Sequence, residues 1–260
     1  MSNILIIGDG PLAYEMAALA ESAKHTVTTY FYSQHGPQHD HPLAGLPYFM
    51  KEMADNVELV VEAIVANREE KWMAIDRINA SFVGSEEPIL TTTLNASATE
   101  VSDWVVYPEN VVGWAALPPL ASSKVFELMP GLKTNPIMTQ KAADFLTSLG
   151  REVVEVKDST GGVLPRVVAN LINEAAFTLM QGVADPDDID KAMQQGTNYP
   201  HGPLQWGDII GLDQVQGILN ALAGVYGNRN RPAPLIQQYV KAGFWGKRTE
   251  RGFYIYGREP

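Results

Sequence analysis

A glycine-rich turn near the N-terminus constrains the fold more than any other feature of the sequence. It follows the apolar run 4–7, it precedes a helical pattern over 11–24, and it has the sequence Gly8-Asp9-Gly10-Pro11-Leu12-Ala13. Between a strand and a helix, GxGxxA spacing is typical of dinucleotide-binding domains. There the two glycines permit a tight turn and a close approach to pyrophosphate, and the small third residue lets the helix pack on the strand. We expect a Rossmann-type domain with Gly8, Gly10, Leu12 and Ala13 at the cofactor.

Two features of this turn predict weak or lost cofactor binding. Asp9 places a negative charge beside the expected diphosphate, and Pro11 removes one backbone donor from the start of the helix. About 20 residues further on, where a carboxylate normally binds the adenine ribose, the chain has Tyr30-Phe31-Tyr32-Ser33. This stretch has no cation for a 2′-phosphate, so NAD is expected in preference to NADP.

The spacing of apolar segments predicts two domains. Up to Lys157, β-branched runs alternate with helical patterns, which is typical of an α/β domain with a parallel sheet. Strands are expected at 4–7, 26–31, 57–64, 89–92, 111–115, 125–129 and 153–156, with helices at 68–78 and 139–149. Beyond this point only helical periodicity remains, at 163–181, 186–193, 213–226 and 234–242. We expect an α/β domain over 1–157 and a helical domain over 158–260.

Composition excludes several classes of partner. The formal net charge of -11 disfavours nucleic acid and anionic membranes, and the absence of cysteine excludes disulfides, thiolate zinc sites and iron–sulfur clusters. No apolar stretch reaches the roughly 18 residues needed to span a bilayer, and the first apolar run is too short for a signal peptide. A cytoplasmic location is expected.

Motifs in the second half give the chain a family resemblance. In order, they are Lys157-Asp158-Ser159-Thr160-Gly161, Asn173-Glu174-Ala175, Gly182-Val183, Asp188-Ile189-Asp190, Tyr199-Pro200-His201-Gly202-Pro203, Gly211-Leu212-Asp213 and Arg251-Gly252-Phe253-Tyr254. With this order and spacing, the chain resembles the 3-hydroxyacyl-CoA dehydrogenase family. The resemblance implies an NAD-binding domain, a helical domain that forms a homodimer, and oxidation of a 3-hydroxyacyl-CoA. It also implies that Glu62, Lys71 and Thr92 belong to the cofactor site.

The residues expected to react depart from the family pattern. The resemblance puts Ala115 at the position of the general-base histidine, and it puts Glu127, which is present, at the carboxylate that orients that histidine. Leu94 stands at the oxyanion-binding serine and Pro165 at an asparagine. A general base contributes about 10²–10⁴-fold and an oxyanion donor about as much, so hydride transfer by the family's mechanism should be severely impaired. By period-two alternation, Glu127 is alternatively a solvent-facing strand residue.

Other side chains offer substitutes, each with a plainer interpretation. His201 stands where the family usually has methionine, and it is either a replacement base or a turn histidine at a helix start. Thr91, Thr92, Thr93 and Asn95 offer donors to a carbonyl or merely end a strand. His35, His39 and His41 lie in a Pro/Gly-rich stretch that favours a solvated loop, so no metal site is expected.

Three hypotheses follow for the function. The first is a divergent NAD-dependent oxidoreductase acting on a 3-hydroxyacyl-CoA or a related carbonyl, with a substitute proton donor. The second is a non-catalytic dimeric binding or scaffold protein on the same fold. The third is an oxidoreductase for a smaller substrate without CoA, because the region after Phe31 is shorter than the helical excursion that the family uses there to hold CoA.

Overall fold

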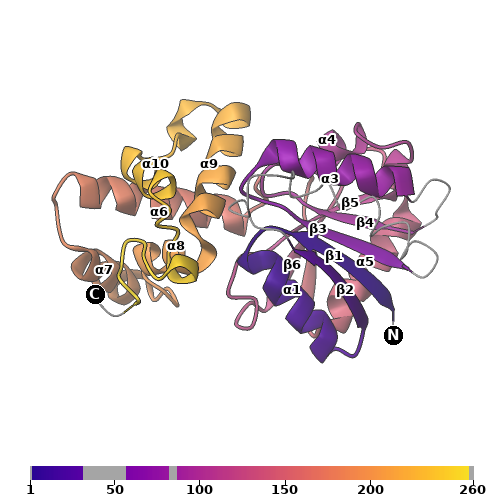
Figure 1. Ribbon diagram of the computed structural model, residues 1–260, viewed down its shortest axis with the longest axis horizontal. Helices are drawn as coiled ribbons and strands as arrows, with labels where there is room; N and C mark the ends of the chain where they lie inside the picture. The colour runs from indigo at the N-terminus through magenta and orange to yellow at the C-terminus, as the bar shows by residue number, and fades with distance from the viewer. Residues whose placement is uncertain (1, 32–56, 82–86, 258–260) are drawn as a thin grey trace, which may run out of the picture. The chain divides into compact units, whose positions relative to one another are not determined.

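The computed structural model describes residues 2–31, 57–81 and 87–257. It divides the chain into two compact units, Met1–Gly162 and Val163–Pro260 (Figure 1). The division falls beyond the boundary expected at 157 because the intervening residues are bonded to the first unit. The Asp158 carboxylate accepts the backbone N–H groups of Ala98 and Thr99, both at 2.8 Å, and the Gly161 N–H donates to the Thr93 carbonyl at 2.7 Å.

The first unit is built on a mostly parallel sheet. Within the described residues, the strand order is β2-β1-β3-β4-β5-β6-β7. The strands are β1 (Asn3–Gly8), β2 (Thr26–Phe31), β3 (Leu59–Ala63), β4 (Ile89–Thr92), β5 (Val111–Ala115), β6 (Val125–Pro130) and β7 (Glu152–Glu155). All seven lie within about two residues of the expected ranges, and the Rossmann-type prediction is confirmed.

One strand departs from the parallel arrangement that is expected for this domain. Strand β6 is antiparallel to β5, with Ala115 opposite Glu127. Residues 116–124 contain no helix, and a direct connection of this length returns the chain antiparallel, whereas a parallel crossover needs a dozen or more residues. Helix α5 (Pro136–Ser148) supplies such a crossover, and β7 accordingly lies parallel to β6.

Helices cover both faces of the sheet (Figure 1). On one face lie α3 (Arg68–Ser81) and the short α4 (Ala98–Ser102), and on the other lie α1 (Pro11–Ser22) and α5. Leu5 and Ile7 of β1 belong to the same buried cluster as Ile75 and Ile78 of α3. Helix α4 had no counterpart among the expected elements, since five residues are too few for a periodic pattern.

The second unit is helical, as predicted. Its helices are α6 (Leu164–Met180), α7 (Pro186–Thr197), α8 (Pro203–Ile210), α9 (Leu212–Tyr226) and α10 (Pro234–Lys241), of which α8 was not among the expected ranges. Short 3₁₀ turns cover Pro108–Asn110 in the first unit and Asn228–Asn230 and Lys247–Thr249 in the second. In the described part of the chain, no helix combines the length and apolarity needed to cross a bilayer. The cytoplasmic location stays a prediction.

Two buried carboxylates, those of Asp208 and Asp190, hold the C-terminal segment of the helical unit. Asp190 of α7 accepts the Tyr254 hydroxyl at 2.8 Å. Asp208 of α8 accepts the N–H groups of Phe253 and Tyr254, both at 2.9 Å, and the Tyr256 hydroxyl at 3.0 Å. A Cβ at Gly252 would lie 2.0 Å from an Asp208 carboxylate oxygen, so the glycine is required for this contact. The Arg-Gly-Phe-Tyr motif is therefore explained by packing and backbone hydrogen bonding.

Asp208 should make folding stability depend on pH. Burial raises the pKa of its carboxyl from 3.8 to about 6, against the effect of its three hydrogen-bond donors. Between these values the folded chain holds the proton more tightly than the unfolded chain, so the contribution of Asp208 to stability falls as pH rises. Relative to Asp208→Asn, the wild-type free energy of unfolding should fall by about 1–3 kcal/mol from pH 4 to pH 7.

Urea unfolding at a series of pH values measures this difference. Asp103→Asn is the matched control, because the Asp103 side chain is 83% exposed. Parallel pH profiles for the wild type and Asp208→Asn would contradict the prediction.

Candidate functional site

The order of the strands places a candidate site at the C-terminal ends of β1 and β3. The chain passes from β1 to β2 on one side and returns to β3 on the other, so β1 and β3 flank the point where the strand order reverses. In open α/β sheets, ligands bind in the crevice at this point. The loops that face this crevice are Asp9-Gly10, after β1, and 64–66, after β3.

The glycine turn has the shape that the sequence predicts. A Cβ at Gly8 would lie only 2.2 Å from the Ala13 Cβ and 3.0 Å from the Ala63 carbonyl oxygen, which shows how closely α1 packs on β1. Gly10 is the extended N-cap residue of α1 and supplies no side-chain cap. The Leu12 side chain is 2% exposed, so only its backbone is placed to meet a ligand. A helix N-terminus without a side-chain cap fits a pyrophosphate.

Asp9 does not point into solvent. Its side chain is 4% exposed and crosses from the β1 loop to the β3 loop. There its carboxylate oxygens accept the N–H groups of Val65 at 3.3 Å and Ala66 at 3.4 Å. The negative charge expected beside a diphosphate is therefore held between the β1 loop and the β3 loop.

A buried ion pair lies directly beneath these loops. The side chains of Glu62 and Lys71 have no exposed surface, and the Lys71 Nζ lies 2.6 Å from the Glu62 Oε2. The same ammonium donates to the Thr92 carbonyl at 2.5 Å, and Thr91 Oγ1 donates to Glu62 Oε2 at 2.6 Å. Burial lowers the pKa of Lys71, and the negative charges of Glu62 and, more weakly, Asp9 oppose this shift. The pair joins the C-terminal ends of β3 and β4 to α3.

The structure thus brings together the predicted cofactor residues Glu62, Lys71 and Thr92. Neither charged side chain has exposed surface in the structure, and both hold backbone groups at the ends of β3 and β4. Within the described residues, Thr92 Oγ1 is buried without a hydrogen-bond partner. A direct contact of these residues with a cofactor stays a prediction.

Asn95 is also used internally. Its Nδ2 donates to the carbonyls of Ile64 at 3.1 Å and Val65 at 3.0 Å, so the amide that was considered for a substrate carbonyl fixes the β3 loop instead. The sequence offered Asn95 as a donor without indicating its acceptors, because these lie some 30 residues away in the loop that follows β3.

Glu127 lies inside the first unit, beside the position where a base is expected. Its side chain is 7% exposed, so the solvent-facing alternative was wrong. A Cβ at Gly162 would lie 2.5 Å from the Glu127 Oε2 and 3.4 Å from the Ala115 Cβ. Carboxylate, methyl group and glycine therefore form one small cluster, in which the side chain opposite Glu127 carries no titratable proton.

The remaining expected residues are distributed over both units. His201, partly exposed before α8 in the helical unit, packs edge to face on Trp206 with ring centroids 5.8 Å apart, and its role as a base stays a prediction. At the end of β2, Phe31 pairs with Tyr14 at 4.7 Å, where a ribose-binding carboxylate was sought. His35, His39 and His41 lie outside the described residues, so the solvated-loop interpretation is untested.

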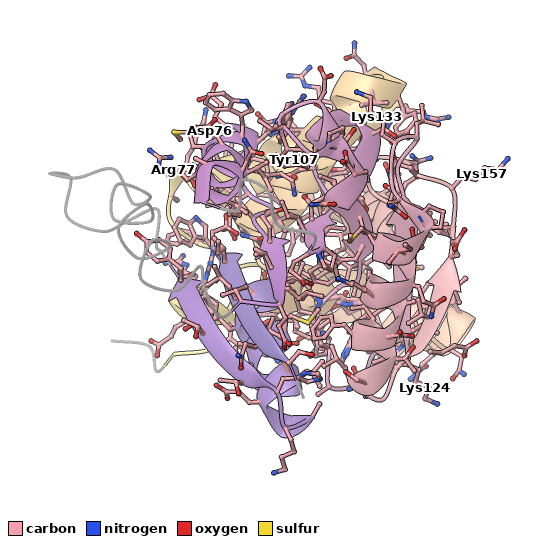
Figure 2. The ribbon with its side chains drawn as sticks, turned by 90° about the vertical axis from the view of Figure 1, so that its right-hand side faces the viewer. Asp76, Arg77, Tyr107, Lys124, Lys133 and Lys157 are labelled. Carbon is pink, nitrogen blue, oxygen red and sulfur yellow. The ribbon has the colours of Figure 1, made fainter. Side chains whose placement is uncertain are left out.

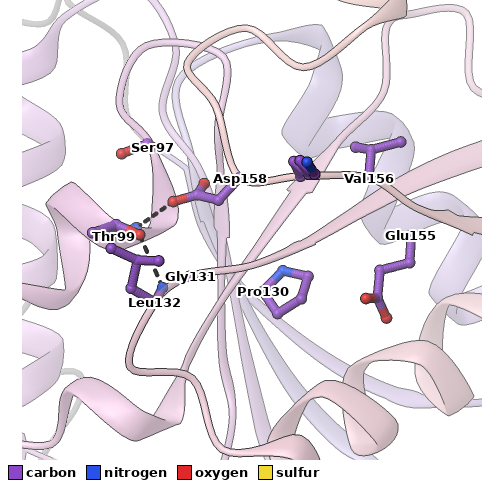
Figure 3. Close-up of a pocket in the computed structure, with 9 residues that line it drawn as sticks. Ser97, Thr99, Pro130, Gly131, Leu132, Glu155, Val156 and Asp158 are labelled. Atoms are coloured by element: carbon purple, nitrogen blue, oxygen red, sulfur yellow. Dashed lines mark hydrogen bonds between the residues drawn. The ribbon is translucent and has the colours of Figure 1, made fainter.

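A surface pocket of about 650 Å³ lies near α4, lined in part by Ser97, Thr99 and Lys157 (Figure 3). Its polar groups are largely used internally: Asp158 caps α4, Thr99 Oγ1 accepts the Leu132 N–H, and Ser97 accepts the Glu100 N–H. Lys157 extends into solvent at its rim, as do Lys124 and Lys133 elsewhere on this unit (Figure 2). We assign no ligand to this pocket.

Removing the cation from the buried pair should destabilise the first unit. Lys71→Met leaves the Glu62 carboxylate buried without its ion-pair partner, which should lower the free energy of unfolding by about 3–5 kcal/mol. The double variant Glu62→Gln/Lys71→Met should be destabilised less, because neither charge remains. Urea unfolding measures all three proteins, and a double variant less stable than Lys71→Met would contradict this account.

Comparisons with known proteins agree with this fold. Residues 47–159 match the sequence model of the 3-hydroxyacyl-CoA dehydrogenase NAD-binding domain, and residues 161–256 match that of the C-terminal domain. The first match begins after the glycine turn, so the structure itself places that turn at the start of the domain.

Individual relatives point the same way. The chain is 35% identical over 209 residues to a probable 3-hydroxybutyryl-CoA dehydrogenase of Bacillus subtilis, covering 79% of this chain and 71% of the relative. It is 32% identical over 213 residues to a 3-hydroxybutyryl-CoA dehydrogenase of Bradyrhizobium diazoefficiens, covering 81% and 72%. A crystal structure of (S)-3-hydroxybutyryl-CoA dehydrogenase from Ralstonia eutropha superposes with a TM-score of 0.74 at 25% identity, covering 99% of this chain and 100% of that one. The chain belongs to the 3-hydroxyacyl-CoA dehydrogenase family.

Proposed function

We propose that this chain is an NAD-dependent oxidoreductase whose hydride transfer is strongly slowed, and whose substrate is a 3-hydroxyacyl-CoA or a related carbonyl compound. The observation that carries the proposal is the buried pair of Ala115 and Glu127, directly opposite each other on β5 and β6. The carboxylate that would orient a base is retained, and a methyl group stands at the position of the base itself.

The geometry of this pair explains why the absence of a histidine at position 115 matters. Directly opposed residues of antiparallel strands have Cβ atoms about 4.5–5.5 Å apart, so a side chain at 115 is within reach of the Glu127 carboxylate. A histidine there would accept and release the substrate proton, whereas alanine does neither. Leu94, 1% exposed, places an apolar side chain where the family pattern has a hydroxyl. Proton transfer and charge stabilisation are both weakened.

The features of the crevice support a dinucleotide held weakly. Gly8 lets α1 pack closely on β1, and the N-terminus of α1 has no side-chain cap in the place that a pyrophosphate would take. The strand order reverses at this turn. NAD supplies hydride acceptance when it is bound, and the chain's own contribution is to position it and exclude water. The aromatic pair Tyr14 and Phe31 at the end of β2 offers no cation for a 2′-phosphate, which favours NAD over NADP.

The rate of hydride transfer should be low compared with that of a family member that has the catalytic histidine. We expect reduction of acetoacetyl-CoA by NADH to be at least about 10³-fold slower than for a family member with histidine and serine, since a base and an oxyanion donor are both replaced. Steady-state assays of this protein and of such an enzyme under the same conditions measure the difference in rate. Fluorescence measures the binding of NADH to this protein. Ordinary turnover would contradict the slowed mechanism. Absence of NADH binding at millimolar concentration would instead support the non-catalytic scaffold.

A single substitution tests the cause. Ala115→His should raise the rate about tenfold or more, because it returns a base opposite Glu127, although Leu94 and Pro165 remain unchanged. The matched control is Ala115→His/Glu127→Gln, which keeps the imidazole and removes its orienting charge, and it should lose most of the gain. If thermal unfolding shows Ala115→His to be folded and its rate is unchanged, the missing base is not what limits activity.

We also propose that the helical unit forms a homodimer through the start of α6. Val163, Leu164 and Val167 are 56%, 42% and 56% exposed, whereas Val168 and Ala175 on the same helix are 3% and 6% exposed. Val168 and Ala175 therefore pack inside their own chain. The three exposed residues form an apolar patch that a second copy would cover by two-fold symmetry.

Light scattering should therefore give about twice 28.5 kDa at micromolar concentration. Val167→Asp should shift the protein towards the monomer, because association would bury an unpaired carboxylate. Ile137→Asp is the control, since Ile137 is 62% exposed on α5 of the other unit, and it should stay dimeric. A wild-type mass of 28.5 kDa would exclude this dimer.

A further inference from the structure

Asp9 occupies an unusual place for a charged residue of a glycine turn. It lies between Gly8 and Gly10, where the strand order reverses, and its carboxylate spans from the β1 loop to the β3 loop. Together, Glu62 and Asp9 take three consecutive backbone N–H groups of the β3 loop, those of Ile64, Val65 and Ala66. A protein carboxylate therefore lies where amide donors face the crevice.

The hydrogen bonds that Asp9 accepts from Val65 and Ala66 are not the shortest contacts of the β3 loop. They are 3.3 and 3.4 Å long, whereas charge-assisted N–H···O bonds are usually about 2.7–2.9 Å. The same loop is fixed by shorter bonds, at 2.5 Å from Ile64 to Glu62 and at 3.0 and 3.1 Å from Asn95. The loop should keep its conformation when the carboxylate of Asp9 is removed.

In the part of the chain that the structure describes, Asp9, Glu62 and Lys71 form a charged group with a net negative charge. Glu62 and Lys71 bind each other at 2.6 Å, and Lys71 also donates to the Thr92 carbonyl. Two carboxylates and one ammonium give this group a formal charge of -1, which lies beside the N-terminus of α1. The N-terminus of a helix attracts anions, so a carboxylate and a diphosphate compete for the same field and neighbouring amide donors.

We propose that Asp9 sets the affinity of the glycine turn for diphosphate-containing ligands, by holding a built-in negative charge at the place where the diphosphate binds. This inference rests on the proposed function, because it takes a dinucleotide to be the ligand. Binding requires the carboxylate to move away or to tolerate a like charge nearby. The Asp9 carboxylate repels the diphosphate and not the nucleoside. It should therefore weaken binding of NADH and ADP-ribose and leave the affinity for adenosine unchanged.

Neutralising this side chain provides the test. Asp9→Asn keeps the shape and an acceptor oxygen, and Asp9→Ala removes both. Both should bind NADH and ADP-ribose about tenfold more tightly than the wild type, with adenosine affinity unchanged within about twofold. The matched control is Glu21→Gln, which removes the same charge from an exposed position near the other end of α1 and should change none of these affinities. Isothermal titration gives the affinities, and thermal unfolding checks the fold of each variant.

The outcomes separate the role of Asp9 from the proposed function. The inference is supported if the Asp9 variants, but not Glu21→Gln, bind both diphosphate ligands more tightly than the wild type. If the wild type binds NADH and the folded variants bind it equally or more weakly, the inference is overturned while the proposed function stands. An equal gain for adenosine also overturns it, because the effect is then not one of charge on the diphosphate. If neither the wild type nor the variants bind NADH or ADP-ribose at millimolar concentration, the proposed function fails as well.

Discussion

The ammonium group of Lys71 determines how the crevice is built. It lies between the carboxylate of Glu62 and the carbonyl of Thr92, and it thereby joins the C-terminal ends of two neighbouring strands to α3. Burial of an ion pair is costly and adds little net stability compared with apolar packing, but a satisfied pair allows few alternative arrangements. The loops above the pair are therefore held in one geometry. The Lys71 ammonium that fixes these loops is bound to Glu62 and Thr92 and has no exposed surface.

The parts of this structure that follow from local pattern were predictable from the sequence. The apolar run before Gly8 and the small residue at Ala13 predicted the β1–α1 unit, and the loss of β-branched runs predicted the helical unit. The direction of β6 was not predictable in this way, because an apolar strand has the same pattern in either direction. Its direction follows from a helix-free connection. The hydrogen-bond partners of Asp9 were also not predictable from local pattern, since the amides of Val65 and Ala66 lie 56 and 57 residues away along the chain.

The catalytic positions show the limits of a resemblance. Matching positions located Glu127 correctly in the interior, and alternation along the strand did not. What the match did not supply is the reason for the carboxylate to persist beside Ala115. The backbone of Gly162, at φ 58°, passes so close to Glu127 that any side chain there would collide with the carboxylate. The Glu127 carboxylate therefore also packs against the backbone of Gly162, which is a second reason for an acid of this length at this position.

The cap that Asp158 places on α4 has a consequence for how the first unit is completed during synthesis. A helix of five residues has little stability of its own, and both amides that Asp158 accepts belong to its first turn. During synthesis, these amides gain their hydrogen-bond acceptor only when the chain has been extended by about 60 further residues. A fragment truncated after Lys157, where the sequence pattern changes, would end one residue before this cap and would also lack the Gly161 bond to Thr93. We therefore expect the smallest fragment that folds as an independent Rossmann unit to extend beyond Lys157, into the residues that the sequence pattern assigns to the next domain.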